Sequence, residues 1–240
     1  MLATDDRSTV LAPLVGAGAA TLALGYLLPG IAHLYGPLRH ALGVEDRTAS
    51  GRGYALTFDD GPHAQGTPAV LEILARAEVS ATFFLVGEQV RRNPTLVGEI
   101  LAAGHQVGLH CDRHRNLLRL APWQVREDIA RARDTIEQAG GATPALYRPP
   151  YGVLNAAALA LARRRGWRTL LWSDWGRDWD ARATPQSIAA LLTENADEGS
   201  VLLLHDADDY GSPSSWRRTV AALPLALETL AQRGLRPVAP

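Results

Sequence analysis

The sequence predicts an α/β fold, a distorted or partly open (β/α) barrel with about seven parallel strands. Short apolar runs that favour β-strands alternate with longer helical patterns from residue 54 onward. Such alternation implies parallel strands, because each helix returns the chain to the start of the next strand. In addition, chemically active side chains directly follow several of these runs, and the C-terminal strand ends are where a (β/α) barrel carries its active site. The pattern alone also allows a doubly wound open sheet.

The strands are placed by where their apolar runs stop. Residues 54–58 are apolar and β-prone and are stopped by Asp-Asp-Gly-Pro, and residues 106–109 form a similar run before a histidine. The expected strands are 54–58, 79–86, 105–110, 144–148, 168–172, 200–205 and 235–238. The expected helices are 67–77, 89–103, 122–139, 154–165, 185–197 and 217–233.

Carboxylates and imidazoles at these strand ends have the composition of a catalytic metal site. Asp59 and Asp60 follow the first strand, and His110 and His114 follow the third. The His-x3-His spacing places both imidazoles on one side of a helical turn, so they can converge on one ion. Three protein ligands leave an open position for a water or a carbonyl oxygen, with the second carboxylate beside it as a general base. Each piece alone is common in turns and on helix surfaces, but together they predict a metal-assisted hydrolase.

Five motifs, in this order, resemble those of the polysaccharide deacetylases, the NodB homology domain of carbohydrate esterase family 4. They are T-F-D-D-G-P at 57–62, H-C-D-R-H at 110–114, R-P-P-Y-G at 148–152, a fourth that contains Asp178 and Trp179, and L-L-H at 203–205. The resemblance extends from about Tyr54 to Val238. It implies the distorted β/α barrel of that family.

The resemblance also implies roles for the first three motifs. It makes three residues the metal ligands: Asp60, His110 and His114. Asp59 becomes the catalytic base, Arg148 the residue that orients this base, and Tyr151 the donor of a backbone N–H to the oxyanion. The ligand types favour one Zn²⁺ ion, and Co²⁺, Ni²⁺ or Mn²⁺ fit the same set.

The last two motifs are expected to supply the acid and part of the substrate pocket. His205 resembles the group that protonates the leaving amine, for which an imidazole titrating near neutrality is suited. Asp178 is expected to orient it, although Trp175 stands where the family often has an acid and Asp174 lies one place earlier. The orienting carboxylate is therefore either Asp178 or Asp174. Trp179, together with Trp175, is expected to form a wall for stacking sugars.

Composition limits the function classes. A net charge of −1 gives no electrostatic argument for binding nucleic acid. The single cysteine, Cys111, stands where the family usually has Ser or Thr, and it excludes an intrachain disulfide. Its side chain should point away from that of His110, so a packed side chain is favoured over a fourth metal ligand.

The N-terminal segment predicts a membrane anchor. Residues 10–38 contain no Asp, Glu or Arg, and about 20 apolar residues are enough to cross a bilayer. We expect residues 1–50 to be an anchor segment and linker, the linker covering 39–53, and residues 51–240 to be the catalytic domain. A buried or amphipathic helix is the alternative. The usual work of the family places the catalytic domain outside the cytoplasm, whereas the arginines after the segment favour the cytoplasmic side.

The predicted reaction is removal of N-acetyl groups from an N-acetylhexosamine-containing glycan or glycoconjugate, such as a chitooligosaccharide or peptidoglycan. A close variant acts on another amide, a formamide or a cyclic imide, because the same site attacks any accessible acyl carbon. A non-catalytic carbohydrate-binding barrel is the other class, but binding alone does not need a base, an acid and a metal together.

Overall fold

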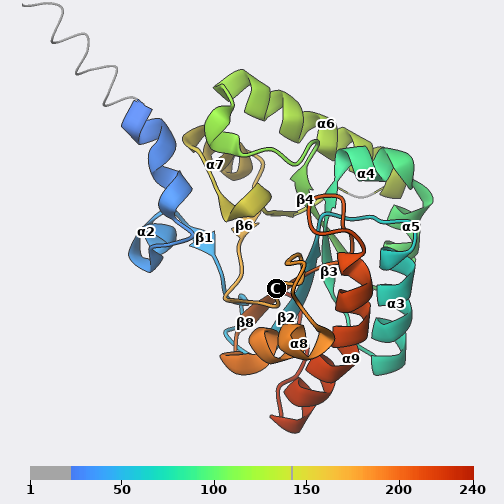
Figure 1. The fold of residues 1–240 in the computed structure, drawn as a ribbon. Helices are drawn as coiled ribbons and strands as arrows, with labels where there is room; N and C mark the ends of the chain where they lie inside the picture. Colours follow the sequence, from blue (N-terminus) through green and yellow to red (C-terminus); the bar gives the residue numbers. More distant parts are fainter. Residues whose placement is uncertain (1–22, 142) are drawn as a thin grey trace, which may run out of the picture.

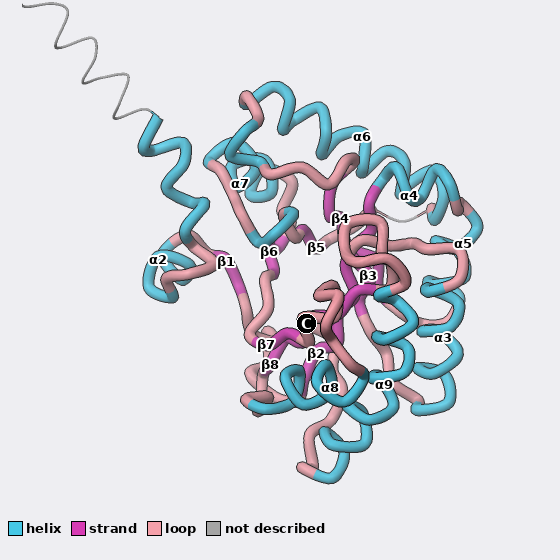
Figure 2. Tube along the Cα trace, viewed as in Figure 1, coloured by secondary structure: helices cyan, strands magenta, loops and turns pink. Residues whose placement is uncertain are grey.

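The computed structural model describes residues 23–141 and 143–240, which form one eight-stranded sheet with helices around it (Figure 1). Every strand pairing is parallel. The order across the sheet is β1-β6-β5-β4-β3-β2-β8-β7. The sheet is open and strongly curled, so its strands form a half-barrel (Figure 2). The strands are β1 Val44–Glu45, β2 Tyr54–Asp59, β3 Thr82–Val86, β4 Gln106–Cys111, β5 Leu146–Tyr147, β6 Arg168–Leu170, β7 Asp174–Trp175 and β8 Ser200–His205.

Helices α3 to α9 cover the convex side of the described sheet (Figure 1). They are α3 Gly66–Ala77, α4 Gly87–Arg92, α5 Thr95–Ala102, α6 Pro122–Gly140, α7 Ala156–Arg164, α8 Pro185–Glu194 and α9 Ser215–Gln232. The other described helical elements include η1 Leu28–Ile31, α2 Gly36–Ala41, η2 Leu117–Arg119 and η3 Pro150–Gly152. The predicted α/β half-open barrel is thereby confirmed.

Three details differ from the sequence prediction. The helix expected at 89–103 is two helices, because Asn93 precedes Pro94 and leaves the helical region with φ −135° and ψ 59°. The strand expected at 235–238 is reduced to one isolated bridge between Tyr54 and Pro237. Strands β1 and β7 were not predicted, since two residues are too few to produce a periodic pattern.

The centre of the sheet is buried on both faces, which explains its continuous apolar runs. Every residue of β2 and β3 is buried. Phe58 and Phe83 stack on neighbouring strands with ring centroids 5.1 Å apart. Arg148 is among the largest fully buried side chains, and its guanidinium lies 4.0 Å from the centroid of the Phe84 ring. A buried charge needs partners, and the carboxylate of Asp59 and backbone carbonyl oxygens supply them.

The segment before the first predicted strand is partly built into the fold. The residues expected to form a linker, 39–53, include β1, which pairs with β6 at one edge of the sheet. Val44 is only 4% exposed, and Glu45 accepts a bond from Arg168 Nε at 3.0 Å. Residues 10–22 of the expected anchor lie outside the described residues. Among the residues that the structure describes, no helix is long and apolar enough to cross a membrane.

Candidate active site

Side chains from the C-terminal ends of separate strands meet in one hollow of about 270 Å³. Its lining includes seven of the nine residues that the sequence predicted for the site. The other two, Arg148 and Asp178, are buried behind this lining. The complete lining is Asp59, Asp60, His110, His114, Tyr151, Trp172, Trp175, Trp179, Leu203, His205 and Tyr210.

The expected metal ligands converge as predicted. One ligand atom from each of Asp60, His110 and His114 lies within 4.8 Å of the others. Asp60 Oδ1 is 3.5 Å from His110 Nε2 and 3.3 Å from His114 Nε2. Bonds of about 2.0–2.1 Å at tetrahedral angles separate two zinc ligands by about 3.3 Å, so the spacing fits one divalent cation.

The protonation of these groups also fits a cation. Burial lowers the pKa of His110 and of His114 to about 3, so both rings are neutral at pH 7 and keep a lone pair for a metal. His110 Nδ1 lies 2.7 Å from the carbonyl oxygen of Arg148, to which it donates, and this directs Nε2 toward Asp60. Asp60 Oδ1 is buried without a hydrogen-bond partner, and burial raises the pKa of Asp60 to about 7. A divalent cation would satisfy the orphaned oxygen and the two lone pairs at once.

Asp59 is fixed by a buried arginine. Arg148 Nη1 donates to Asp59 Oδ1 and to Thr57 Oγ1, both at 2.8 Å. The other guanidinium nitrogens donate to the carbonyl oxygens of Leu170 at 2.9 Å and Leu171 at 2.8 Å. With all three nitrogens bound, the guanidinium is locked and holds one Asp59 oxygen, as the sequence predicted.

His205 is held by Asp178, which resolves the alternative that the sequence left open. Asp178 Oδ1 accepts from His205 Nδ1 at 2.9 Å, and Oδ2 accepts from the His205 backbone N–H at 2.7 Å. Asp174 instead accepts from the hydroxyls of Ser173 and Ser200, at 2.7 and 3.1 Å. Burial alone would lower the pKa of His205, but the carboxylate of Asp178 outweighs it and raises that pKa to about 10. With this raised pKa the ring is an imidazolium at pH 7, and its Nε2 lies 3.8 Å from Asp60 Oδ2.

Tyr151 lies at a strained turn beside the ligands. Its φ of 60° is in the left-handed region, which a non-glycine residue adopts only when its surroundings impose it. Gly152 and Val153 direct their N–H groups back to Pro149 and Pro150, whereas no acceptor in residues 23–141 and 143–240 bonds the N–H of Tyr151. That N–H is thus available to a ligand, as an oxyanion donor requires.

Three tryptophans form a continuous aromatic wall. The ring centroids of Trp172 and Trp175 are 5.9 Å apart, and those of Trp175 and Trp179 are 5.4 Å apart. Trp179 meets His205 edge to face, with centroids 5.3 Å apart. Trp175 stays 42% exposed, so part of the wall remains free for a ligand.

Two residues of the site were missed by the sequence reasoning. Tyr210 stacks on the ring of His114, with centroids 4.5 Å apart, and its hydroxyl donates to Glu88 Oε1 at 2.5 Å. Asp206 is buried below the loop that carries Asp60, where Thr67 donates to its carboxylate. Its position after His205 at a strand end was a signal in the sequence, whereas nothing in the sequence pointed to Tyr210.

The neighbouring Cys111 is 1% exposed and does not belong to the cluster of ligand atoms. Burial raises the pKa of its thiol, which opposes formation of a thiolate ligand. The sequence interpretation of a packed side chain agrees with this position.

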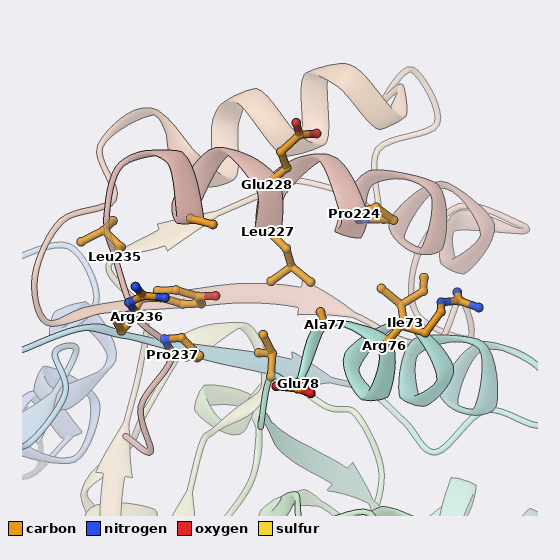
Figure 3. A pocket seen from close by; sticks show the side chains of 13 residues that line it. Ile73, Arg76, Ala77, Glu78, Pro224, Leu227, Glu228, Leu235, Arg236 and Pro237 are labelled. Atoms are coloured by element: carbon orange, nitrogen blue, oxygen red, sulfur yellow. The ribbon is translucent and has the colours of Figure 1, made fainter.

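A larger hollow, of about 680 Å³, lies at the opposite end of the sheet between α3 and α9 (Figure 3). Leu227 points from α9 toward Ile73 and Ala77 on α3, whereas Glu228 points away (Figure 3). None of the nine predicted site residues lines it.

Comparison with known proteins agrees with this geometry. The family model described as polysaccharide deacetylase matches residues 46–170. A peptidoglycan-N-acetylglucosamine deacetylase of Bacillus cereus is 38% identical over 185 residues, which cover 76% of this chain and 83% of that protein. A chitooligosaccharide deacetylase of Bradyrhizobium sp. is 35% identical over 190 residues, with coverages of 76% and 86%.

The fold agrees equally well with a solved structure. A peptidoglycan N-acetylglucosamine deacetylase, crystallised with 4-naphthalen-1-yl-N-oxidanyl-benzamide, superposes with a TM-score of 0.78 at 28% identity. The superposition covers 85% of this chain and 94% of that one.

Proposed function

The chain belongs to the polysaccharide deacetylase family and is a hydrolase of carbon–nitrogen bonds, and from this premise we propose that it removes N-acetyl groups from N-acetylhexosamine glycans with one divalent cation. The substrate class is a glycan of the peptidoglycan or chitooligosaccharide type, as named for the relatives. Zn²⁺ is the cation that the two imidazoles and one carboxylate fit best.

One observation carries the proposal. A carboxylate held by Arg148 and an imidazole held by Asp178 line the same hollow as the three converging ligand atoms. A binding protein has no use for a locked base and an oriented acid beside a cation site. Arg148 fixes the position of Asp59, and the carboxylate of Asp178 outweighs burial and raises the pKa of His205, so one site holds a positioned proton acceptor and a positioned proton donor.

The side chains divide the work of hydrolysis. Asp59 accepts a proton from the attacking water as its oxygen bonds to the acetamide carbon. The N–H of Tyr151 stabilises the negative charge that develops on the carbonyl oxygen. His205 then donates its proton to the amide nitrogen as the C–N bond breaks, giving acetate and a free amine. Asp60, His110 and His114 would hold the divalent cation, which would supply Lewis-acid polarisation of the reacting groups when bound.

The tryptophan wall is proposed to position the sugar. Trp175 and Trp179 offer apolar ring faces next to His205, and sugars present apolar C–H faces of similar size. The ring that carries the acetamide is then held with its nitrogen toward the acid.

For the N-terminal segment we propose attachment to a membrane, with the catalytic region outside the cytoplasm. Leu24 is 70% exposed and Leu34 75% exposed, and more apolar side chains are exposed between them. This face continues the uncharged sequence of residues 10–22. Deleting residues 1–22 should move the protein from the membrane fraction to the soluble fraction of a lysate without changing acetate release.

Acetate release tests the catalytic proposal. The zinc-loaded protein should release acetate from chitotetraose or from peptidoglycan strands, lose this activity with a chelator, and regain it when Zn²⁺ is returned. Efficient release of formate from N-formyl substrates, with none of acetate, would assign the site to another amide. Absence of both, with the metal bound, would contradict the catalytic reading.

A further inference from the structure

A second hollow lies directly beside the active site. It has a volume of about 500 Å³ and is formed by the chain that follows β4 and leads into η2. His114 and Tyr151 line both hollows, so the two are contiguous at these side chains. The remaining lining is Arg115, Asn116, Arg119 and Leu120. A glycan that places one sugar at the catalytic groups has its neighbouring unit within reach of this hollow.

The polar lining of the second hollow consists of hydrogen-bond donors, and no carboxylate lines it. Asn116 uses its side-chain oxygen to accept from the Leu118 N–H at 3.0 Å, which leaves its amide N–H groups for a ligand. Arg115 donates through Nη2 to Asp128 at 2.6 Å, but its Nε has no acceptor within the described chain. The catalytic hollow, by contrast, is lined by Asp59 and Asp60.

Arg119 carries a positive charge that has no anionic partner in the described part of the chain. It is exposed at the end of η2, and no Asp or Glu of residues 23–141 and 143–240 forms an ion pair with it. The backbone beneath it is fixed, since Leu117 is buried and its carbonyl accepts from Asn155 Nδ2 at 2.7 Å. Arg119 and Tyr151 line the same hollow, so the guanidinium is available on the side of the hollow that faces the active site.

We propose that this second hollow binds a carboxylate of the glycan, carried by the unit next to the N-acetyl group that is removed. The inference rests on the proposed function and narrows its substrate to an acidic glycan. Arg119 forms the charge-assisted bond, and Asn116 adds a neutral donor. Two sources supply such a carboxylate in a peptidoglycan strand: the lactyl ether of a muramic sugar, and the peptide attached to it.

Three substrates distinguish the sources: chitotetraose, which is neutral, a peptide-free strand with lactyl carboxylates, and the same strand with its peptides. Wild-type kcat/KM should be higher for at least one acidic strand than for chitotetraose. Arg119→Gln should lower this acidic-to-neutral ratio roughly fivefold, the upper range for an exposed ion pair, and Arg119→Lys should restore part of it. The strand that responds identifies the carboxylate.

Arg126→Gln is the matched control. Arg126 is exposed on the neighbouring α6, and its substitution removes the same charge from a position outside the second hollow. Three results would overturn the proposed carboxylate site: an equal loss of kcat/KM on neutral and acidic glycans in Arg119→Gln, no loss on any of them, or the same change in the Arg126→Gln control. Calorimetric binding of the three glycans to Asp59→Asn, with and without Arg119→Gln, separates the two proposals. If acetate is never released, the proposed function fails. The ratio of the affinities for acidic and neutral glycans, with and without Arg119→Gln, still tests whether the second hollow binds a carboxylate.

Discussion

The two ends of the sheet differ in a way that cavity size does not predict. The hollow at the N-terminal end has about 680 Å³ and the catalytic hollow about 270 Å³. The larger one is lined by apolar side chains of α3 and α9 and by charged groups at their rim, such as Arg76 (Figure 3). Arg76 pairs with Glu72 on the same helix. The smaller one brings a locked base, an acid and three ligand atoms together. Convergence of buried polar groups, and not volume, marks the functional end.

Residues with positive φ occur at both hollows, but they have different causes. Glu78 at the larger hollow has φ 56°, but it merely ends α3 in a left-handed cap. Asp60, directly after β2, has a φ of 78°, and Tyr151, within the short η3 that follows β5, has a φ of 60°; neither residue caps an α-helix. Their strain is maintained by the packing around the site, and it aims one carboxylate and one backbone N–H into the hollow.

The largest expected difference between the two hollows is the loss of kcat when the proposed base or the proposed acid is substituted. Asp59→Asn and His205→Ala should each lower kcat by roughly 10² to 10⁴, because a positioned proton acceptor or donor contributes about that factor. Glu228→Gln removes a charge at the opposite hollow and should leave kcat unchanged. Steady-state acetate release measures all three, together with metal content. Normal turnover of either catalytic variant would remove its assigned role.

Loss of a ligand should come next in size. His114→Ala should weaken zinc affinity by more than about tenfold and reduce activity at limiting zinc, because it removes one of three protein ligands. Metal titration and elemental analysis measure this loss. His40→Ala, at an exposed histidine of α2, is the control and should keep its metal. If His114→Ala retains full occupancy and activity, the cation site has been misplaced.

The pH dependence sharpens the role of Asp178. Activity requires Asp59 as a carboxylate and His205 as an imidazolium, so the rate profile should be bell-shaped. Because Asp178 raises the pKa of His205 to about 10, activity is lost only as the pH rises toward that value, and a bound cation moves this limb lower. Asp178→Asn removes the stabilising charge and should shift the alkaline limb down by roughly 1–2 pH units.

Asp174→Asn is the control for this shift, because Asp174 bonds two serines and does not touch His205. An alkaline limb that moves in Asp174→Asn and stays fixed in Asp178→Asn would reverse the two assignments.

The smallest effect concerns the boundary of the folded unit. A chain that begins at Gly51 lacks β1 and with it the buried Val44, whose burial is worth about 2 kcal/mol. We expect its Tm to fall roughly 4–8 °C below that of a chain beginning at residue 23. Calorimetry of the two chains measures the difference. Equal melting temperatures would show that β1 contributes nothing to stability and would restore the linker interpretation.

Much of the site could be predicted from the sequence, because its residues lie at or directly after the ends of strands. The pairs Asp59-Asp60 and His110-x3-His114 directly follow apolar runs, and parallel strands bring such ends together whatever the loops between them do. Local order along the chain therefore predicted parallel α/β architecture and the set of ligand side chains without knowledge of the register.

The tertiary structure decided what depends on contacts between distant segments. Asp174 lies in β7 and Asp178 follows that strand by three residues. Only the packing of α9, whose Thr219 also bonds Asp178, selects Asp178 for His205. Tyr210 reaches His114 from a loop almost a hundred residues away, and β1 and β7 are too short to carry a pattern. The sequence thus indicated which groups gather at the site, because strand periodicity is local. Which partner holds each group was decided by side-chain packing across the sheet, and packing is not encoded in any single segment.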